Sequence, residues 1–168
     1  QSDLPEPSAD ARAASAALLR LIAAEIDACG GWISFVRYME LALYAPGLGY
    51  YSGGSHKFGD HEAGGDFLTA PELTPLFGRA LARQVAQVLA ASAPQVIEAG
   101  AGSGRLAADL LQALDALGCA PERYRILELS GELRARQQAT LAARAPQFVD
   151  RVEWLDELPR NPNGKFDR

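Results

Sequence analysis

The sequence predicts an α/β protein built on a parallel, doubly wound sheet, and two observations lead to that class. From Pro94 onward, short apolar runs alternate with amphipathic helical patterns in the order strand, helix, strand, helix, strand. Such alternation favours parallel strands joined by helical crossovers. A glycine-rich loop follows the first run and opens the first helix, which is a place where open α/β sheets bind ligands.

Length and composition are those of a single globular domain. The 168 residues are 48% hydrophobic and 22% charged, which is enough for a sizeable core. The net charge of −5 argues against a chain that mainly binds nucleic acid, because such domains are usually basic. The sequence has no run of about 20 apolar residues, so no membrane insertion is expected.

The cysteines and histidines favour neither a disulfide framework nor a metal site. Cys29 and Cys119 are far apart and form no C-x-x-C pair, which predicts two buried thiols in a reducing compartment. His56 and His61 are the only histidines and have no cysteine or third histidine nearby. A metal ion needs three or four ligands, so no metal is expected.

We assign residues 1–93 to an N-terminal helical region with a glycine-rich loop. Apolar residues at helical spacing predict one helix over 9–28 and a second over 34–45, for which Ser34 is the expected N-cap. Residues 46–68 are rich in glycine and lack periodicity. A loop of that length inside a compact domain is often functional.

A third helix is expected from Thr69 to about Ala91. Thr69 is followed three residues later by Glu72, which is the spacing of a capping box. Pro71 falls in the first turn, where its missing N–H costs little. Apolar residues then recur at helical spacing along the rest of the segment.

We assign residues 94–168 to the first half of a ligand-binding α/β domain. Its strands are expected to be short and rich in β-branched and aromatic residues, and its helices carry leucines at spacings of three and four. The expected elements are a strand over 95–99, a helix over 104–117, a strand over 124–129, a helix over 131–145 and a strand over 148–155.

The loop after the first strand reads G-A-G-S-G over residues 100–104. A phosphate-binding P-loop would need G-x-x-x-x-G-K-[ST], and no lysine follows Gly104, so a nucleoside triphosphatase is not favoured. The dinucleotide fingerprint G-x-G-x-x-G would need its third glycine where Arg105 stands. An NAD-binding oxidoreductase therefore stays only as an alternative.

S-adenosylmethionine fits the loop better, because glycines let the backbone approach a ligand that has no pyrophosphate. Glu98 completes the order apolar, apolar, acid, small, G-x-G-x-G, which resembles the first motif of class I methyltransferases; this acid can face the cofactor's ammonium group. Glu128 ends the second strand, where an acid can accept hydrogen bonds from both ribose hydroxyls. Leu155 and Asp156 lie where class I enzymes bind adenine. The expected cofactor contacts from these segments are Glu98, Gly100, Ala101, Gly102, Gly104, Glu128, Leu129, Leu155 and Asp156.

Four segments make the chain resemble the MidA family of S-adenosylmethionine-dependent methyltransferases. They are Y-M-E-L-A-L-Y-A-P-G-L-G-Y-Y (38–51), G-D-F-L-T-A-P-E-L-T-P-L-F-G (65–78), V-I-E-A-G-A-G-S-G (96–104) and I-L-E-L-S (126–130). The family includes bacterial proteins and a mitochondrial complex I assembly factor that acts as a protein arginine methyltransferase. The resemblance implies a class I methyltransferase Rossmann-like sheet, and it places Asp66 and Thr69 near the cofactor pocket.

The resemblance also implies a protein acceptor, an arginine side chain, and a respiratory complex I subunit as one such substrate. An arginine acceptor would need a carboxylate to orient its charged guanidinium. Asp66 and Glu72 are the candidates in this chain, and no catalytic residue is assigned.

Family members are longer, so we expect this chain to contain only the first half of the sheet. A chain with half of the sheet is expected to be inactive by itself. The expected compartment is the bacterial cytoplasm, or the mitochondrial matrix for a eukaryotic protein, and a non-catalytic assembly factor is the other alternative.

Overall fold

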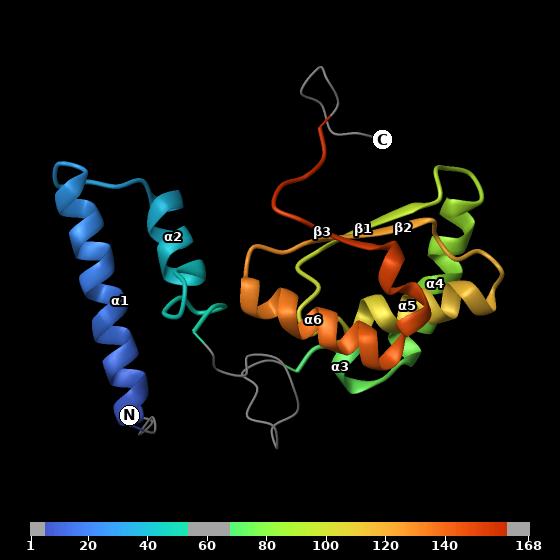
Figure 1. Ribbon diagram of the computed structural model, residues 1–168, viewed down its shortest axis with the longest axis horizontal. Helices are drawn as coiled ribbons and strands as arrows, with labels where there is room; N and C mark the ends of the chain where they lie inside the picture. The colour runs from blue at the N-terminus through green and yellow to red at the C-terminus, as the bar shows by residue number, and fades with distance from the viewer. Residues whose placement is uncertain (1–5, 54–67, 161–168) are drawn as a thin grey trace, which may run out of the picture. The chain divides into compact units, whose positions relative to one another are not determined.

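The computed structural model describes residues 6–53 and 68–160 (Figure 1). The chain separates into two compact units, Gln1–Ser55 and His56–Arg168. The first unit is helical, and the second contains the sheet. The assignment of residues 1–93 and 94–168 to two domains stays a proposal.

Two helices form the described part of the first unit. α1 covers Ala9–Ala28 and α2 covers Phe35–Tyr44, which confirms both helices expected in this region. Ser34 is the N-cap of α2, and its Oγ accepts a hydrogen bond from the N–H of Arg37 at 3.1 Å. The Nε of Arg37 also donates to Oε1 of Glu25 at 2.8 Å, so an ion pair joins the two helices.

Both cysteines are free thiols, but they differ in exposure. Cys119 is half-buried, whereas Cys29 is exposed. The expectation that both thiols are buried is wrong for Cys29, because this residue is the C-cap of α1 and lies beyond the turn that buries Ile22.

The helix expected over residues 69–91 is interrupted. α3 covers only Ala70–Leu73, and α4 covers Leu76–Leu89. Pro75 causes the break, because a proline excludes the residue before it from the helical region of backbone space. Thr74 accordingly has an extended backbone, with φ −164° and ψ 143°.

Three parallel strands form the sheet in the order β1-β2-β3, which confirms the expected α/β class. Each strand is joined to the next by a helix, so that both crossovers are of the β-α-β kind. The elements are β1 (Gln95–Ala99), α5 (Arg105–Ala116), β2 (Arg123–Leu127), α6 (Gly131–Arg144) and β3 (Val152–Leu155).

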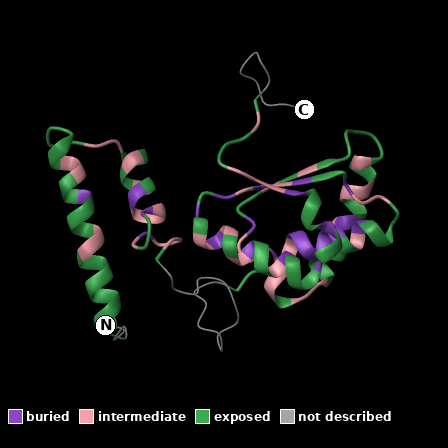
Figure 2. Ribbon diagram, viewed as in Figure 1, coloured by how far each residue is buried: buried purple, intermediate pink, exposed green. Residues whose placement is uncertain are grey.

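The core lies between the sheet and one layer of helices. α4, α5 and α6 gather on one face of the sheet (Figure 1), and the buried residues concentrate where the two layers meet (Figure 2). Alternate strand residues face this layer; Tyr124 and Ile126 of β2 are buried there with Leu111 and Leu114 of α5. Ile97 alternates with these core-facing positions and is 42% exposed. Within the second unit, the described helices α4, α5 and α6 leave this opposite face of the sheet uncovered (Figure 1).

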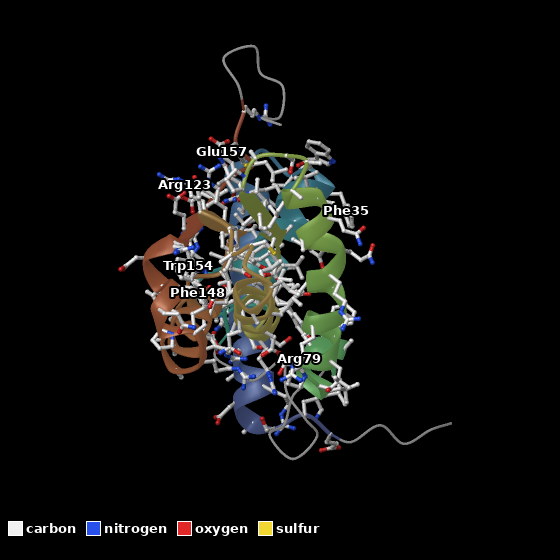
Figure 3. The ribbon with its side chains drawn as sticks, turned by 90° about the vertical axis from the view of Figure 1, so that its right-hand side faces the viewer. Phe35, Arg79, Arg123, Phe148, Trp154 and Glu157 are labelled. Carbon is white, nitrogen blue, oxygen red and sulfur yellow. The ribbon has the colours of Figure 1, made fainter. Side chains whose placement is uncertain are left out.

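The strand expected over residues 148–155 is partly helical. A 3₁₀ helix, η2, covers Pro146–Arg151, and only the last four residues form β3. Pro146 begins the 3₁₀ helix because a proline fits a first helical turn but cannot donate to a strand ladder. Phe148 of η2 is buried in the core cluster against which Trp154 of β3 packs (Figure 3). The burial of Phe148 in the core thus favours the 3₁₀ helix over the strand that the residue types predict.

Candidate functional site

The carboxyl ends of the three strands meet at one edge of the sheet. Ala99, Leu127 and Leu155 are in register there. The N–H of Gly100 donates to the carbonyl of Leu127 at 3.0 Å, and the N–H of Glu128 donates to the carbonyl of Leu155 at 3.3 Å. The segments that follow the strands therefore start side by side, at the edge where open parallel sheets bind ligands.

Three glycines shape the loop between β1 and α5. Gly100, Gly102 and Gly104 have φ angles of 67°, 55° and 82°, a left-handed backbone that other residues rarely adopt. A Cβ on Gly100 would meet no atom within 4 Å, whereas a Cβ on Gly104 would lie 3.0 Å from the Cα of Gln137. Gly104 therefore lets α6 pack closely on the loop, while Gly100 borders open space. Ala101 between them is buried.

Glu98 of β1 has a partner within the protein. Its Oε2 accepts a hydrogen bond from the hydroxyl of Tyr124 at 2.7 Å. Burial raises the pKa of Glu98 above its usual range, and the hydrogen bond from Tyr124 offsets part of that rise. Burial, followed by the neighbouring carboxylate, raises the pKa of Tyr124 as well. Contact between Glu98 and a cofactor ammonium group stays a prediction.

Replacing Glu98 with glutamine is expected to remove part of the pH dependence of stability. Because the pKa of Glu98 is raised in the folded protein, the folded state binds more protons than the unfolded chain between the ordinary and the raised pKa. The free energy of unfolding therefore falls as the pH rises through that window, and the cost of burying the charge is complete above it.

Urea unfolding of the wild type and of Glu98→Gln, from about pH 4 to about pH 8, measures this difference. The Tyr124→Phe variant is a matched control, because it removes the hydrogen bond that lowers the pKa of Glu98. It should extend the window to higher pH. If the free energy of unfolding changes with pH in the same way in the wild type and in Glu98→Gln, the raised pKa of Glu98 is contradicted.

Glu128 is buried, and both of its carboxylate oxygens already accept a hydrogen bond. Oε1 accepts from the N–H of Ser130 at 2.9 Å, and Oε2 accepts from Nε2 of Gln137 at 3.1 Å. Ser130 is the N-cap of α6 and Gln137 lies within that helix. A carboxylate has about four acceptor sites, so each oxygen can accept one further hydrogen bond. Two ribose hydroxyls would require two such sites.

Arg134 of α6 holds the end of β3. Its Nη2 donates to the carbonyl of Leu155 at 2.9 Å and to Oδ1 of Asp156 at 2.6 Å, and its Nε donates to the carbonyl of Glu128 at 2.6 Å. The side chain of Asp156 is 88% exposed, so this ion pair contributes little to stability. It does keep the carboxylate close to the edge of the sheet. Leu129 is also exposed at this edge.

Glu72 of α3 reaches the glycine loop. Its Oε1 accepts a hydrogen bond from the Ser103 hydroxyl, and its Oε2 lies 3.4 Å from Nη1 of Arg105. The expected capping box is therefore wrong: the Glu72 carboxylate pairs with the loop, and Thr69 makes no side-chain cap bond. Thr69 is exposed, and Asp66 lies outside the described residues. The proximity of these two residues to the cofactor stays a prediction.

The sequence patterns did not single out Gln137 and Arg134, the side chains that hold the carboxylates of Glu128 and Asp156. Gln137 is the clearest case, because it is fully buried on α6 between the buried Leu133 and Leu141. A polar residue at the i+4 position of an apolar stripe was the signal that could have found it. Arg134 leaves no comparable signal, since two of its three partners are backbone carbonyls.

The sequence predicts neither a metal site nor a membrane-spanning segment, and the structure bears on both only within its described residues. In ranges 6–53 and 68–160, no group of three or more His, Cys, Asp or Glu side chains is placed to hold a metal ion. His56 and His61 lie outside these ranges. None of the helices in the same ranges is long and apolar enough to cross a membrane.

A parallel sheet with a glycine loop after its first strand and a buried acid after its second defines a Rossmann-like, nucleoside-binding class of protein. Residues 79–166, slightly more than half of the chain, match the model of a family described as "Putative S-adenosyl-L-methionine-dependent methyltransferase". The chain belongs to this family of S-adenosyl-L-methionine-dependent methyltransferases. Membership confirms the methyltransferase class and the cofactor expected from the loop.

Two curated relatives that the chain resembles are named as methyltransferases. The zebrafish (Danio rerio) "Protein arginine methyltransferase NDUFAF7, mitochondrial" is 35% identical over 141 residues, which are 79% of this chain and 32% of the relative. Its homolog from Caenorhabditis elegans is 34% identical over 115 residues, which are 66% of this chain and 27% of the relative. The chain thus spans about a third of these relatives or less.

Solved structures share the fold. A crystal structure of a protein from Burkholderia thailandensis bound to S-adenosyl-homocysteine matches with a TM-score of 0.82 and 58% identity, over 95% of this chain and 42% of that one. A native crystal structure of a protein of the same superfamily, from the same bacterium, matches with a TM-score of 0.75 and 56% identity. This agreement supports a partial Rossmann-like methyltransferase fold.

Proposed function

We propose that the full-length protein transfers a methyl group from S-adenosylmethionine to an arginine side chain of a protein. The observation that carries the methyl-donor part is the position of Glu128. Its carboxylate is held beside the glycine loop and keeps a further acceptor site on each oxygen. The arginine part is supported by the curated relatives, which are named protein arginine methyltransferases.

Each part of the site has one role in this proposal. The carboxylate of Glu128 accepts hydrogen bonds from the ribose hydroxyls, and Leu155 and Asp156 contact the adenine. The backbone at Gly100 and Gly102, which carries no Cβ, lies against the amino-acid portion of the donor. Together these contacts hold the donor so that its methyl group is in line with the acceptor nitrogen.

Deprotonation of the acceptor is not assigned to a residue. A guanidinium needs a carboxylate to orient it and to take up its proton. Glu72 is engaged by Ser103 and Arg105, so its charge stabilises the loop instead. Asp66 lies outside the described residues and stays a candidate.

We propose the bacterial cytoplasm as the compartment of the protein. The support is the higher identity with the Burkholderia thailandensis structure, 58%, than with the mitochondrial relative from zebrafish, 35%. A respiratory complex I subunit, which the sequence resemblance implies, is the first acceptor to test.

Calorimetric titration of the full-length protein tests the cofactor. S-adenosylmethionine and S-adenosylhomocysteine are expected to bind with dissociation constants in the micromolar range, about 8 kcal/mol of binding free energy. NAD is the control ligand and should not bind, because Arg105 replaces the third glycine of the dinucleotide fingerprint. Binding of NAD alone would favour the oxidoreductase alternative.

Methyl transfer from labelled S-adenosylmethionine to bacterial complex I subunits tests the reaction. Label is expected in arginine side chains, and peptide mass spectrometry locates it. A full-length protein that binds the cofactor but labels no subunit or other bacterial protein would favour a non-catalytic assembly factor that retains the fold.

A further inference from the structure

Gln137 joins the three parts of the candidate site. It is a fully buried polar residue in the middle of α6, and all of its side-chain polar atoms are hydrogen-bonded. Its Nε2 donates to the carbonyl of Gly102 and to Oε2 of Glu128, both at 3.1 Å, and its Oε1 accepts from Nε1 of Trp154 at 2.8 Å. One amide thus contacts the glycine loop, the acid after β2, and β3.

The partners determine which way the amide faces. The indole Nε1 of Trp154 can only donate, so it must meet the oxygen of Gln137. The carbonyl of Gly102 and the carboxylate of Glu128 can only accept, so they must meet the nitrogen. Trp154 lies on β3 beside the core (Figure 3), which fixes the donor end of Gln137 toward the edge where the loop and Glu128 meet.

Close packing of α6 on the loop makes this reach possible. At Gly104 an added Cβ would lie 3.0 Å from the Cα of Gln137 and 3.3 Å from its Cβ. A leucine would suit the packing of position 137, since Leu133 and Leu141 occupy the same buried stripe. The glutamine therefore adds directed hydrogen bonds rather than volume.

We propose that Gln137 is a positioning residue that orients the Glu128 carboxylate to accept two adjacent hydroxyls of a ribose. With Ser130 on Oε1 and Gln137 on Oε2, the plane of the carboxylate is fixed before a ligand arrives. No reorientation then opposes binding, which is the benefit of preorganised polar groups. This inference rests on the proposed function, because it takes the nucleoside of S-adenosylmethionine as the ligand.

The test compares two ligands on the full-length protein: S-adenosylhomocysteine and its 2′,3′-dideoxyribose analogue. The ratio of their dissociation constants measures what the hydroxyls contribute, and we expect about 100 in the wild type. Gln137→Leu should weaken S-adenosylhomocysteine about tenfold and change the analogue little, so the ratio falls about tenfold. Gln138→Leu is the matched control, since Gln138 is an exposed neighbour on the same helix, and its ratio should equal that of the wild type.

A purely structural role would give a different result. If Gln137 only packs, Gln137→Leu weakens both ligands equally and leaves the ratio unchanged, which overturns the inference while the proposed function stands. A wild type that binds neither ligand, or binds both equally, overturns the proposed function as well. Thermal unfolding of each variant separates loss of the fold from loss of orientation.

Gln137→Glu provides a second test if the leucine variant does not fold. The introduced carboxylate keeps the shape of glutamine but faces two acceptors, Gly102 and Glu128. The ratio should fall at neutral pH and recover partly on acidification, when the introduced group gains a proton and can donate again. A ratio that matches the wild type at every pH would overturn the inference.

Discussion

Replacing Glu128 with glutamine is expected to weaken binding of S-adenosylhomocysteine about 100-fold in the full-length protein, which corresponds to about 2.7 kcal/mol. Hydrogen bonds to a charged acceptor each contribute about 1.5–3 kcal/mol, and the substitution removes the charge. It also places an NH₂ group where an oxygen now accepts from Ser130 or Gln137. One of these pairs would then set donor against donor.

The matched control for this prediction is Glu122→Gln. Glu122 is exposed and lies just before β2, at the strand end opposite to Glu128. The same charge is removed there without touching the site, so the dissociation constant should stay within about twofold. Titration calorimetry of both variants measures the effect. Equal affinities for Glu128→Gln and the wild type would exclude Glu128 as the ribose-binding acid.

Replacing Gly104 with alanine is expected to lower the free energy of unfolding by about 3 kcal/mol. The φ angle of 82° alone costs an alanine about 1–2 kcal/mol. The new Cβ would also lie 3.0 Å from the Cα of Gln137, so α6 would have to move, at a cost typical of overpacking, about 1–3 kcal/mol. Since α6 carries Gln137 and is capped by Ser130, cofactor affinity should fall as well.

Gly118→Ala separates the two causes. Gly118 follows α5 with a φ angle of 71°, and a Cβ there would meet no atom within 4 Å. This variant should lose only the backbone part, about 1–2 kcal/mol, and should bind cofactor normally. Urea unfolding of both variants measures the difference. The same loss of stability at both glycines would show that contact with Gln137 does not matter.

The helices and strands with continuous patterns were predictable to within two residues at each end. α1 follows from apolar spacing, and α2 follows from apolar spacing and the serine N-cap; both are local properties of the chain. The prediction failed where a proline interrupts a pattern: before α4, at Pro75, and before β3, at Pro146. In both places the apolar spacing continues past the proline, but the backbone cannot continue the expected helix or strand through it.

Part of the candidate site was also predictable, because its groups follow strands. The order of a strand, a glycine loop and a helix implies the sheet edge, and the acid at the end of the next strand must reach the same edge in a parallel sheet. Glu128 and the loop were placed in this way, and the register of the strands agrees with it. Their contact with the cofactor itself stays a prediction.

The sequence by itself therefore determined the class of protein, the order of its elements and the family to which it belongs. Only the tertiary structure decided which groups hold the site together. Glu72 meets Ser103 across 31 residues, and Gln137 meets Gly102 across 35. Apolar periodicity reports which face of an element is buried. It does not report which polar group on another element a buried side chain contacts, because that contact depends on how elements distant in the sequence pack together.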